Sequence, residues 1–226
     1  MKAIEPSARV LFPKTPEEGE QAMLLVEYAG RNCYRSHDRI SPGSYEGFIT
    51  RLVERGHLTP LEFADVVFEL VTSRDVMAQI TRHRLCSFCI QSQRYVVDDR
   101  TGDLLCIRPA FYIPSEGDKR DVKRWCASRM WEQAMEEAEA NYSYLLRECS
   151  MPAQDARKTL PNSAATVIVM KCNLRELWHI LSLRTSPAAY PEMRVLASKM
   201  KDAAREVYPF FISLFDSRMG LEEMKE

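Results

Sequence analysis

The segment 62–72, EFADVVFELVT, constrains the fold of this chain more than any other part of the sequence. Its apolar side chains recur at every second position, in Ala64, Val66, Phe68 and Leu70. A period of two predicts a strand with one buried face. The fold must therefore contain a sheet, because the backbone N–H and C=O groups of a strand need hydrogen-bond partners.

Segments with helical spacing of their apolar residues lie on both sides of this strand. Residues 16–30 carry acidic residues in their first turn, and residues 42–56 end at Gly56, which predicts a C-cap. Ser73 is predicted to cap a short helix that continues through the sequence RDVMAQITRH. Further helices are predicted over residues 118–148, 173–184 and 191–208.

Residues 163–172, SAATVIVMKC, fit either a buried strand or the start of an apolar helix. Residues 84–96 contain too many polar and basic side chains for a core strand, and we predict a loop there. Helices and strands do not alternate regularly along the chain. The pattern therefore predicts an α+β fold, with a mixed or antiparallel sheet flanked by long helices, in a single domain over residues 1–226.

Composition excludes several classes of protein. The net charge of −1 provides no basic footprint for nucleic acid or for an anionic membrane. No stretch approaches the length of a membrane span, and neither a GxGxxG nor a Walker-type sequence occurs. The seven cysteines are scattered and odd in number, which argues against a disulfide framework and favours a reduced, cytoplasmic protein.

The segment Arg82-His83-Arg84, followed after seven residues by Ser92 and then by Arg94, is the main candidate for chemistry. Guanidinium groups are planar donor forks suited to phosphate, and they keep their charge at physiological pH. Like charges gathered on a surface need a compensating anion. The residues alone leave two interpretations open, an anion-binding site and a surface loop paired with Asp or Glu side chains.

This RHR, seven-residue, Ser pattern resembles the signature motif of the flavin-dependent thymidylate synthases. Other segments agree with that family in order and spacing over about residues 30–210. They are Arg55–Glu62 (RGHLTPLE), Gln79, Asp155–Arg157, Leu160-Pro161, Asn173–Arg184 and Glu192–Arg194. The resemblance implies the family's fold and a flavin-dependent methylation of a uracil nucleotide.

The resemblance also implies roles for individual residues. FAD would be bound by Thr59, Arg82, His83, Arg84, Ile90, Asn173, Leu174, Arg175 and His179. The nucleotide dUMP would be bound by Gln79, Arg82, Ile90, Gln91, Ser92, Gln93, Arg94, Arg157 and Arg184. Catalysis would depend on Arg184, which would lie against the uracil ring and favour ionisation at N3, and on the hydroxyl of Ser92.

The implied reaction needs no covalent enzyme nucleophile. NADPH would reduce FAD, methylenetetrahydrofolate would donate the carbon, and reduced flavin would supply a hydride to yield dTMP. The resemblance further implies a homotetramer whose sites are shared between subunits, and neither nucleic acid nor membrane as a partner.

The sequence departs from the family pattern inside the pocket. Cys89 and Ile90 stand where the family usually has Asn-Glu, His179 replaces an asparagine, and Ala189-Tyr190 replaces an Ala-Gln pair. A pocket that loses a polar partner can change its choice between hydroxyl-bearing substrates. A C5-methylase acting on UMP or another uracil nucleotide is therefore an alternative. A non-catalytic nucleotide- or RNA-binding protein is a second alternative.

Two simpler chemistries are not favoured. His83, Cys86 and Cys89 lack a fourth ligand at the usual spacing, so we predict no metal site. A nucleophilic Ser92 would need an adjacent base, and the spacing of the sequence places no histidine or lysine beside it.

Overall fold

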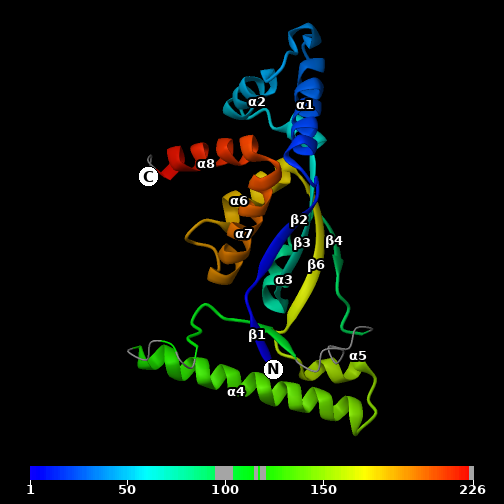
Figure 1. The fold of residues 1–226 in the computed structure, drawn as a ribbon, viewed down its shortest axis with the longest axis vertical. Coiled ribbons are helices and arrows are strands. Elements are labelled where there is room, and N and C mark those ends of the chain that lie inside the picture. Colours follow the sequence, from blue (N-terminus) through cyan, green and yellow to red (C-terminus); the bar gives the residue numbers. More distant parts are fainter. Residues whose placement is uncertain (95–103, 115–116, 118–120, 224–226) are drawn as a thin grey trace. The chain divides into compact units, whose positions relative to one another are not determined.

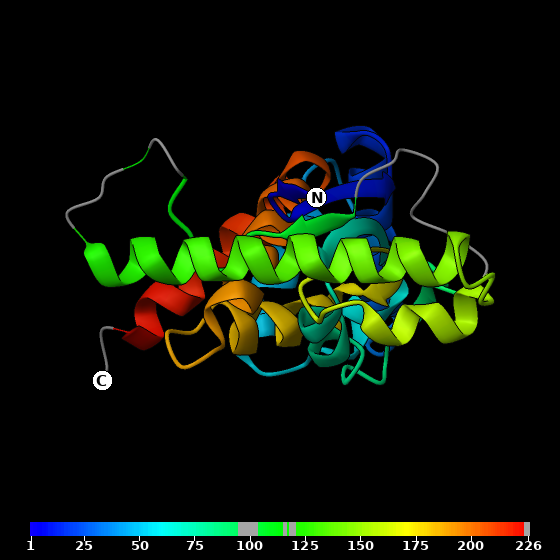
Figure 2. The same cartoon turned by 90° about the horizontal axis from the view of Figure 1, so that it is seen from below.

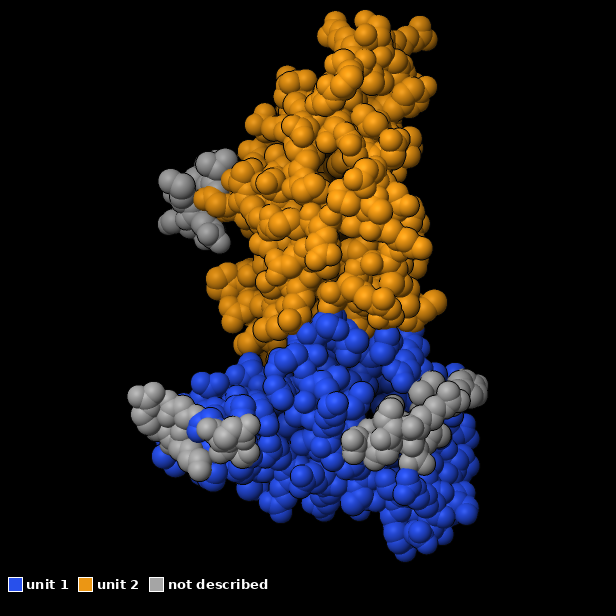
Figure 3. Space-filling model, viewed as in Figure 1, with its two compact units in different colours: residues 1–7, 71–80, 90–168 blue, residues 8–70, 81–89, 169–226 orange. Residues whose placement is uncertain are grey.

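The computed structural model describes residues 1–94, 104–114, 117 and 121–223. The chain divides into two units, which Figure 3 distinguishes by colour. Unit 1 consists of residues 1–7, 71–80 and 90–168, and unit 2 consists of residues 8–70, 81–89 and 169–226. Each unit therefore draws on segments that lie far apart in the sequence.

Strands and helices are interspersed along the chain (Figure 1). In order they are β1 (Lys2–Ile4), β2 (Ser7–Phe12), α1 (Pro16–Asn32), η1 (His37–Arg39), α2 (Ser44–Glu54), η2 (Thr59–Phe63), β3 (Asp65–Ser73), α3 (Arg74–Ile80), β4 (Ser87–Ile90), β5 (Leu105–Ile107), α4 (Val122–Arg147), α5 (Ala153–Ala156), η4 (Arg157–Thr159), β6 (Ala165–Asn173), α6 (Leu174–Arg184), α7 (Pro191–Val207) and α8 (Pro209–Glu223). One sheet has the order β2-β3-β6-β4, and β1 pairs in parallel with β5. The predicted α+β class is confirmed.

Local sequence explains the best-predicted elements. In β3 the side chains of Val66, Phe68 and Leu70 are fully buried, while the residues between them are half-buried, as their period of two requires. Helix α1 begins where the hydroxyl of Thr15 accepts a hydrogen bond from the backbone N–H of Glu18, at 3.3 Å. Helix α2 ends just before Gly56, whose φ of +72° favours glycine.

Two local predictions are wrong. Part of the predicted loop 84–96 is strand β4, which lies at the edge of the sheet beside β6. An edge strand keeps exposed positions, so it tolerates the polar residues that argued against a core strand. Ser73 does not cap α3, because its hydroxyl oxygen is buried without a hydrogen-bond partner among the described residues. Residues 95 and 96 of the predicted loop and residues 118–120 of the predicted helix 118–148 lie outside the described residues.

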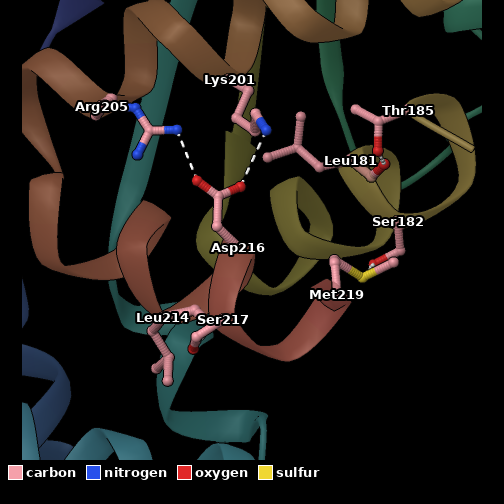
Figure 4. Close-up of polar contacts among 9 residues, drawn as sticks. All are labelled: Leu181, Ser182, Thr185, Lys201, Arg205, Leu214, Asp216, Ser217 and Met219. Atoms are coloured by element: carbon pink, nitrogen blue, oxygen red, sulfur yellow. Dashed lines mark hydrogen bonds and ion pairs between the residues drawn. The ribbon is translucent and has the colours of Figure 1, made fainter. Parts of the chain in front are cut away.

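The core of unit 2 is built largely by α6, α7 and α8, with Trp178 of α6 in edge-to-face contact with Phe211 and Phe215 of α8. Helix α8 is also tied to α7 by charge, because Asp216 accepts hydrogen bonds from Lys201 at 2.9 Å and Arg205 at 2.7 Å (Figure 4). Partial burial alone would raise the pKa of Asp216. The hydrogen bonds from the two cations outweigh that effect and lower this pKa.

Unit 1 has its own smaller core, in which Leu104, Cys106 and Ala164 pack with Trp131 and Met135 of α4. The short helix α5 lies alongside α4 (Figure 2). Of the helices in the described part of the chain, none combines the length and apolar character needed to cross a bilayer.

Candidate functional site

A cavity of about 610 Å³ opens beside helix α6 in unit 2. Helix α6 and the residue before it contribute most of its lining, namely Asn173, Arg175, Glu176, Trp178, His179 and Ser182. Leu58, Glu62 and Leu85 complete it. The volume lies within the range of small-molecule and cofactor sites, and the mixture of apolar walls with a few polar groups is typical of them.

The sequence places these side chains through the geometry of α6. Asn173 caps the helix, because its Oδ1 accepts a hydrogen bond from the backbone N–H of Glu176 at 2.9 Å. The spacing of Arg175, His179 and Ser182 then brings them to one face. Arg175 is held by an ion pair with Glu62 of η2, with 2.5 Å between Nη1 and Oε1. The cavity is therefore bordered both by the N-terminal end of α6 and by the guanidinium of Arg175, which Glu62 holds in place.

From this wall a chain of three polar side chains extends inward, formed by Glu176, which lines the cavity, by buried His83 of the RHR motif and by half-buried Arg184. His83 Nδ1 lies 3.3 Å from Glu176 Oε1, and Arg184 Nε donates a hydrogen bond to His83 Nε2 at 3.1 Å. His83 and Glu176 are each 6% exposed. The ring of His179 lies 5.9 Å from that of His83. Tertiary structure has thus joined two predicted functional residues that are 101 positions apart in sequence.

The surroundings of His83 hold it in the neutral form at pH 7. Burial, with smaller contributions from the nearby charges of Arg184 and His179, lowers the pKa of His83 to about 4. Burial also raises the pKa of Glu176. A neutral imidazole can accept a hydrogen bond at one nitrogen and donate at the other, which is what this chain of contacts needs.

Positive charge remains available around the motif. Nη1 and Nη2 of Arg184 have no hydrogen bond or ion pair within the part of the chain that the structure describes. Arg82 and Arg84 are exposed, and among the described residues neither forms an ion pair with a carboxylate. The guanidinium groups of Arg82 and Arg84 are therefore exposed where an anion can reach them.

The remaining cofactor predictions fall on two further positions in unit 2. Thr59 is exposed at the start of η2. Leu174 is fully buried, and its backbone N–H donates to the carbonyl oxygen of Ala64 at 2.9 Å. Thr59 can reach a ligand by its side chain, whereas Leu174 is committed to packing α6 against the residue before β3.

Most of the predicted nucleotide-binding residues lie in unit 1. Gln79 is half-buried on α3, and Ile90 is half-buried at the end of β4. Gln91 supports β6, because its N–H donates to Val167 O at 2.9 Å and its side-chain oxygen accepts from Val167 N at 3.3 Å. The side chain of Gln91 is therefore partly occupied in holding the end of β4 against β6.

The three residues after Gln91 present further polar groups. The hydroxyl oxygen of Ser92 accepts a hydrogen bond from the backbone N–H of Arg94 at 3.3 Å. Gln93 Nε2 is buried and has no hydrogen-bond partner among the described residues. Arg157 is exposed at the start of η4, where its Nε donates to Gln154 O at 3.2 Å. The unsatisfied amide of Gln93 is the kind of group that a bound polar ligand would satisfy.

Sequence reasoning missed six residues that line the cavity, namely Leu58, Glu62, Leu85, Glu176, Trp178 and Ser182. Glu176 follows Asn173 by three positions, which is the ordinary pattern of a helix capping box and so carries no functional signal. Trp178 lies at helical spacing within an apolar pattern and resembles a core residue. Within the described residues no cluster of three or more His, Cys, Asp or Glu side chains could hold a metal ion.

Comparison with known proteins identifies the family. The family model described as thymidylate synthase complementing protein, Thy1, matches residues 17–210. A flavin-dependent thymidylate synthase from Geobacter sulfurreducens is 32% identical over 206 residues, covering 88% of this chain and 82% of that protein. One from Pyrococcus furiosus is 33% identical over 192 residues, covering 84% and 75%.

Two solved structures share the fold. A UMP/dUMP methylase, PolB from Streptomyces cacaoi bound with 5-Br dUMP, superposes with a TM-score of 0.78 at 24% identity, covering 96% of this chain and 97% of that one. Thymidylate synthase X from Helicobacter pylori, with FAD and dUMP, gives 0.69 at 22% identity, covering 93% and 99%. The fold follows from these likenesses, and the family follows from the sequence matches: this chain is an enzyme of the flavin-dependent thymidylate synthase family.

Proposed function

We propose that this enzyme methylates dUMP to dTMP, with methylenetetrahydrofolate as the carbon donor, FAD as the redox cofactor and NADPH as the reductant. The observation that carries the proposal is the partly buried contact between His83 of the RHR motif and Arg184 of α6, which leaves the terminal nitrogens of Arg184 without a partner among the described residues. Membership of an enzyme family sets aside the alternative of a non-catalytic binding protein.

The residues around the cavity in unit 2 fit FAD. Asn173 ends the strand and opens α6, so partial positive charge from the helix start and the cation of Arg175 both face an anionic group. Trp178, Leu58 and Leu85 provide apolar surface for a ring system. Thr59, His179 and the exposed Arg82 and Arg84 would add polar contacts. FAD, once reduced, supplies the hydride that the side chains of the protein cannot provide.

The chain's own residues would bind and polarise the pyrimidine. The two terminal nitrogens of Arg184 can donate together to a uracil edge and stabilise negative charge that develops at N3 and its neighbouring carbonyl. Because His83 is neutral, its contact with Arg184 does not offset the positive charge of the guanidinium. The hydroxyl of Ser92, the amide of Gln93 and the guanidinium of Arg157 would hold the nucleotide, with Gln79 and Arg94.

A spectrum and a turnover assay test the proposal. We expect the purified protein to bind FAD, with flavin absorbance, and to form dTMP from dUMP only when NADPH and methylenetetrahydrofolate are both present. Omission of each component in turn provides the controls. Protein that binds no FAD and forms no dTMP from dUMP would contradict the proposal.

A specific observation favours UMP as a second candidate substrate. Ile90 stands where the family usually has a glutamate, and an isoleucine side chain cannot accept a hydrogen bond. The similar fold of a UMP/dUMP methylase makes UMP the natural competitor to test. Competition between dUMP and UMP in the NADPH-dependent assay would rank the two substrates by kcat/KM.

Replacing Ile90 with Glu tests whether the pocket has merely lost a carboxylate. We expect Ile90→Glu to bind dUMP about tenfold more tightly, in line with one charge-assisted hydrogen bond of about 1.5 kcal/mol. Ile90→Gln has the same length without the charge and is the matched control. Titration of flavin absorbance with dUMP measures both. Unchanged or weaker binding in Ile90→Glu would mean that β4 presents this position differently.

We further propose a single catalytic domain over residues 1–226 and a homotetramer with sites shared between subunits. The sharing of sites between subunits is what the resemblance to the flavin-dependent thymidylate synthases implies. The seven free cysteines agree with a reducing compartment such as the cytoplasm.

A further inference from the structure

Glu176 occupies the third position of α6 after its N-cap, Asn173. A glutamate at this position usually reaches back to the backbone N–H of the N-cap residue and completes a capping box. Here the Asn173 side chain makes its half of the box, through the N–H of Glu176, but the carboxylate turns to His83 instead. Helix capping therefore does not account for the placement of the Glu176 carboxylate.

The contacts of His83 define which of its nitrogens carries the proton. Arg184 Nε is always a donor, so His83 Nε2, which lies 3.1 Å from it, must be an unprotonated acceptor. The single proton of the neutral ring must then be on Nδ1, and Nδ1 lies 3.3 Å from Glu176 Oε1. Glu176 is the acceptor that stabilises this tautomer, since a hydrogen bond at one ring nitrogen sets the state of the other.

Burying Glu176 and His83 carries a cost in folding stability, and a role in the site would explain why the pair is present. Glu176 and His83 are each 6% exposed, and a buried polar pair rarely improves stability over apolar side chains of similar size. The third member of the chain, Arg184, is the residue to which we assign the uracil contact. The orientation of its guanidinium depends on a lone pair at His83 Nε2.

We propose that Glu176 is a positioning residue, which locks His83 in the Nδ1–H tautomer so that Arg184 is held by Nε with both terminal nitrogens free for the substrate. The role in turnover rests on the proposed function, whereas the tautomer does not. Glu176 lines the cavity that we assign to FAD, and it acts on Arg184 through His83.

Substitutions at Glu176 separate the acceptor from the charge. Glu176→Gln keeps an oxygen that can accept from Nδ1–H, so we expect the Nδ1–H tautomer and most of the activity to remain. Glu176→Leu removes the acceptor at similar size. We expect the proton of His83 to move to Nε2, which then opposes the Nε–H of Arg184, and kcat to fall roughly ten- to a hundredfold, as when groups that orient metal-binding histidines are removed.

Nitrogen-15 NMR of the histidine rings measures the tautomer directly. The chain has four histidines, and the spectrum of His83→Gln assigns the His83 signals by their loss. Wild type and Glu176→Gln should show Nδ1 protonated at pH 7, and Glu176→Leu should not. Glu206→Leu, the same change at an exposed position of α7, is the matched control and should match wild type in tautomer and kcat. Circular dichroism checks that each variant is folded.

The outcomes decide the proposal separately from the enzyme's function. Protonation of His83 at Nε2 in the wild type, or an Nδ1–H tautomer that persists in Glu176→Leu, would overturn it. Equal loss of kcat in Glu176→Gln and Glu176→Leu would also overturn it, because the acceptor would then not be what matters. If the wild type forms neither methylated product from dUMP nor from UMP, the proposed function fails, and the NMR spectra still decide the tautomer.

Discussion

At the scale of single residues, the arginine that we assign to the uracil is unusual in being half-buried and yet unsatisfied at its tip. Arg184 uses only Nε within the described residues, in the bond to His83. A guanidinium in a partly water-excluded site stabilises developing negative charge more strongly than one in bulk water. The contribution of Arg184 to the reaction rate should therefore depend both on its charge and on the planar geometry of its guanidinium group.

Arg184→Ala should lower kcat for dUMP about a hundred- to a thousandfold, as expected for the loss of a preorganised donor, while the fold is retained. Arg184→Lys restores the charge without the planar fork and should not restore the rate. NADPH oxidation dependent on dUMP measures the rate, and circular dichroism measures the fold. Arg51→Ala, at an exposed position of α2, is the control. A wild-type rate in Arg184→Ala would remove the assigned role.

His83 should make stability depend on acidity. Its folded pKa of about 4 lies below the ordinary value of 6.5, so the unfolded chain binds the proton more readily between these values. The contribution of His83 to stability is complete above pH 6.5 and is lost as pH falls toward 4. Glu176, whose pKa is raised, works in the opposite direction by taking up a proton in the folded state.

We expect His83→Gln to lose less stability than the wild type between pH 7 and pH 4.5, because an amide does not titrate there. Urea denaturation midpoints at both values measure the difference. The comparison is internal to each variant, so a general destabilisation by the substitution does not affect it. An identical fall in both proteins would show that His83 is not the titrating group.

At the scale of elements, the packing of α1 on the end of α7 depends on a missing side chain. A Cβ built on Gly19 would lie 1.8 Å from the carbonyl oxygen of Val207 and 3.3 Å from the ring of Tyr208. The first contact is with backbone and cannot be relieved by a side-chain rotation. Gly19 is therefore required for close approach, although glycine is a poor helix former.

Gly19→Ala should destabilise the protein by about 1–3 kcal/mol, the usual cost of overpacking. Gly47→Ala is the matched control, because Gly47 is exposed on α2 and a Cβ there would meet only the flexible end of Arg51, at 3.4 Å. That change should stabilise by about 0.5–1 kcal/mol. Urea unfolding monitored by circular dichroism measures both. Stabilisation by both changes would show that α1 and α7 do not approach as described.

At the scale of the whole molecule, two arginines that we predict to bind the nucleotide belong to different units, Arg157 to unit 1 and Arg184 to unit 2. A homotetramer with shared sites allows the two arginines of one site to come from different chains. Two inactive variants could then complement each other. Such complementation tests whether the sites are shared between subunits. The test requires neither a bound ligand nor a known arrangement of the subunits.

Arg157→Ala and Arg184→Ala, each inactive alone, should regain roughly a quarter of the wild-type activity when co-expressed with different tags and purified as mixed tetramers, the value for random assortment. Re-mixing the separately purified variants without subunit exchange is the control. A mixed assembly that stays inactive would place both arginines of a site in one chain.

Sequence patterns predicted the elements whose local signals are strong. The period of two predicted β3. Helical sequence patterns predicted α1 with its acidic first turn, α6 with its cap at Asn173 and α7 with Pro191 at its start. Helix α8 was not predicted, because its apolar residues surround the helix and show no single face. Strand β4 was predicted as a loop, because an edge strand lacks the apolar signature of a central one.

The sequence by itself determined the family, through the RHR motif and its companion segments, because these residue types at these spacings are too specific to arise in another context. It also determined which residues are candidates for cofactor and nucleotide. Only the tertiary structure decided that His83, Glu176 and Arg184 form one chain of contacts, since local patterns carry no information about contacts between residues about 100 positions apart. The protonation state of His83 was decided there too, because burial and neighbouring charge set a pKa and both arise only on folding.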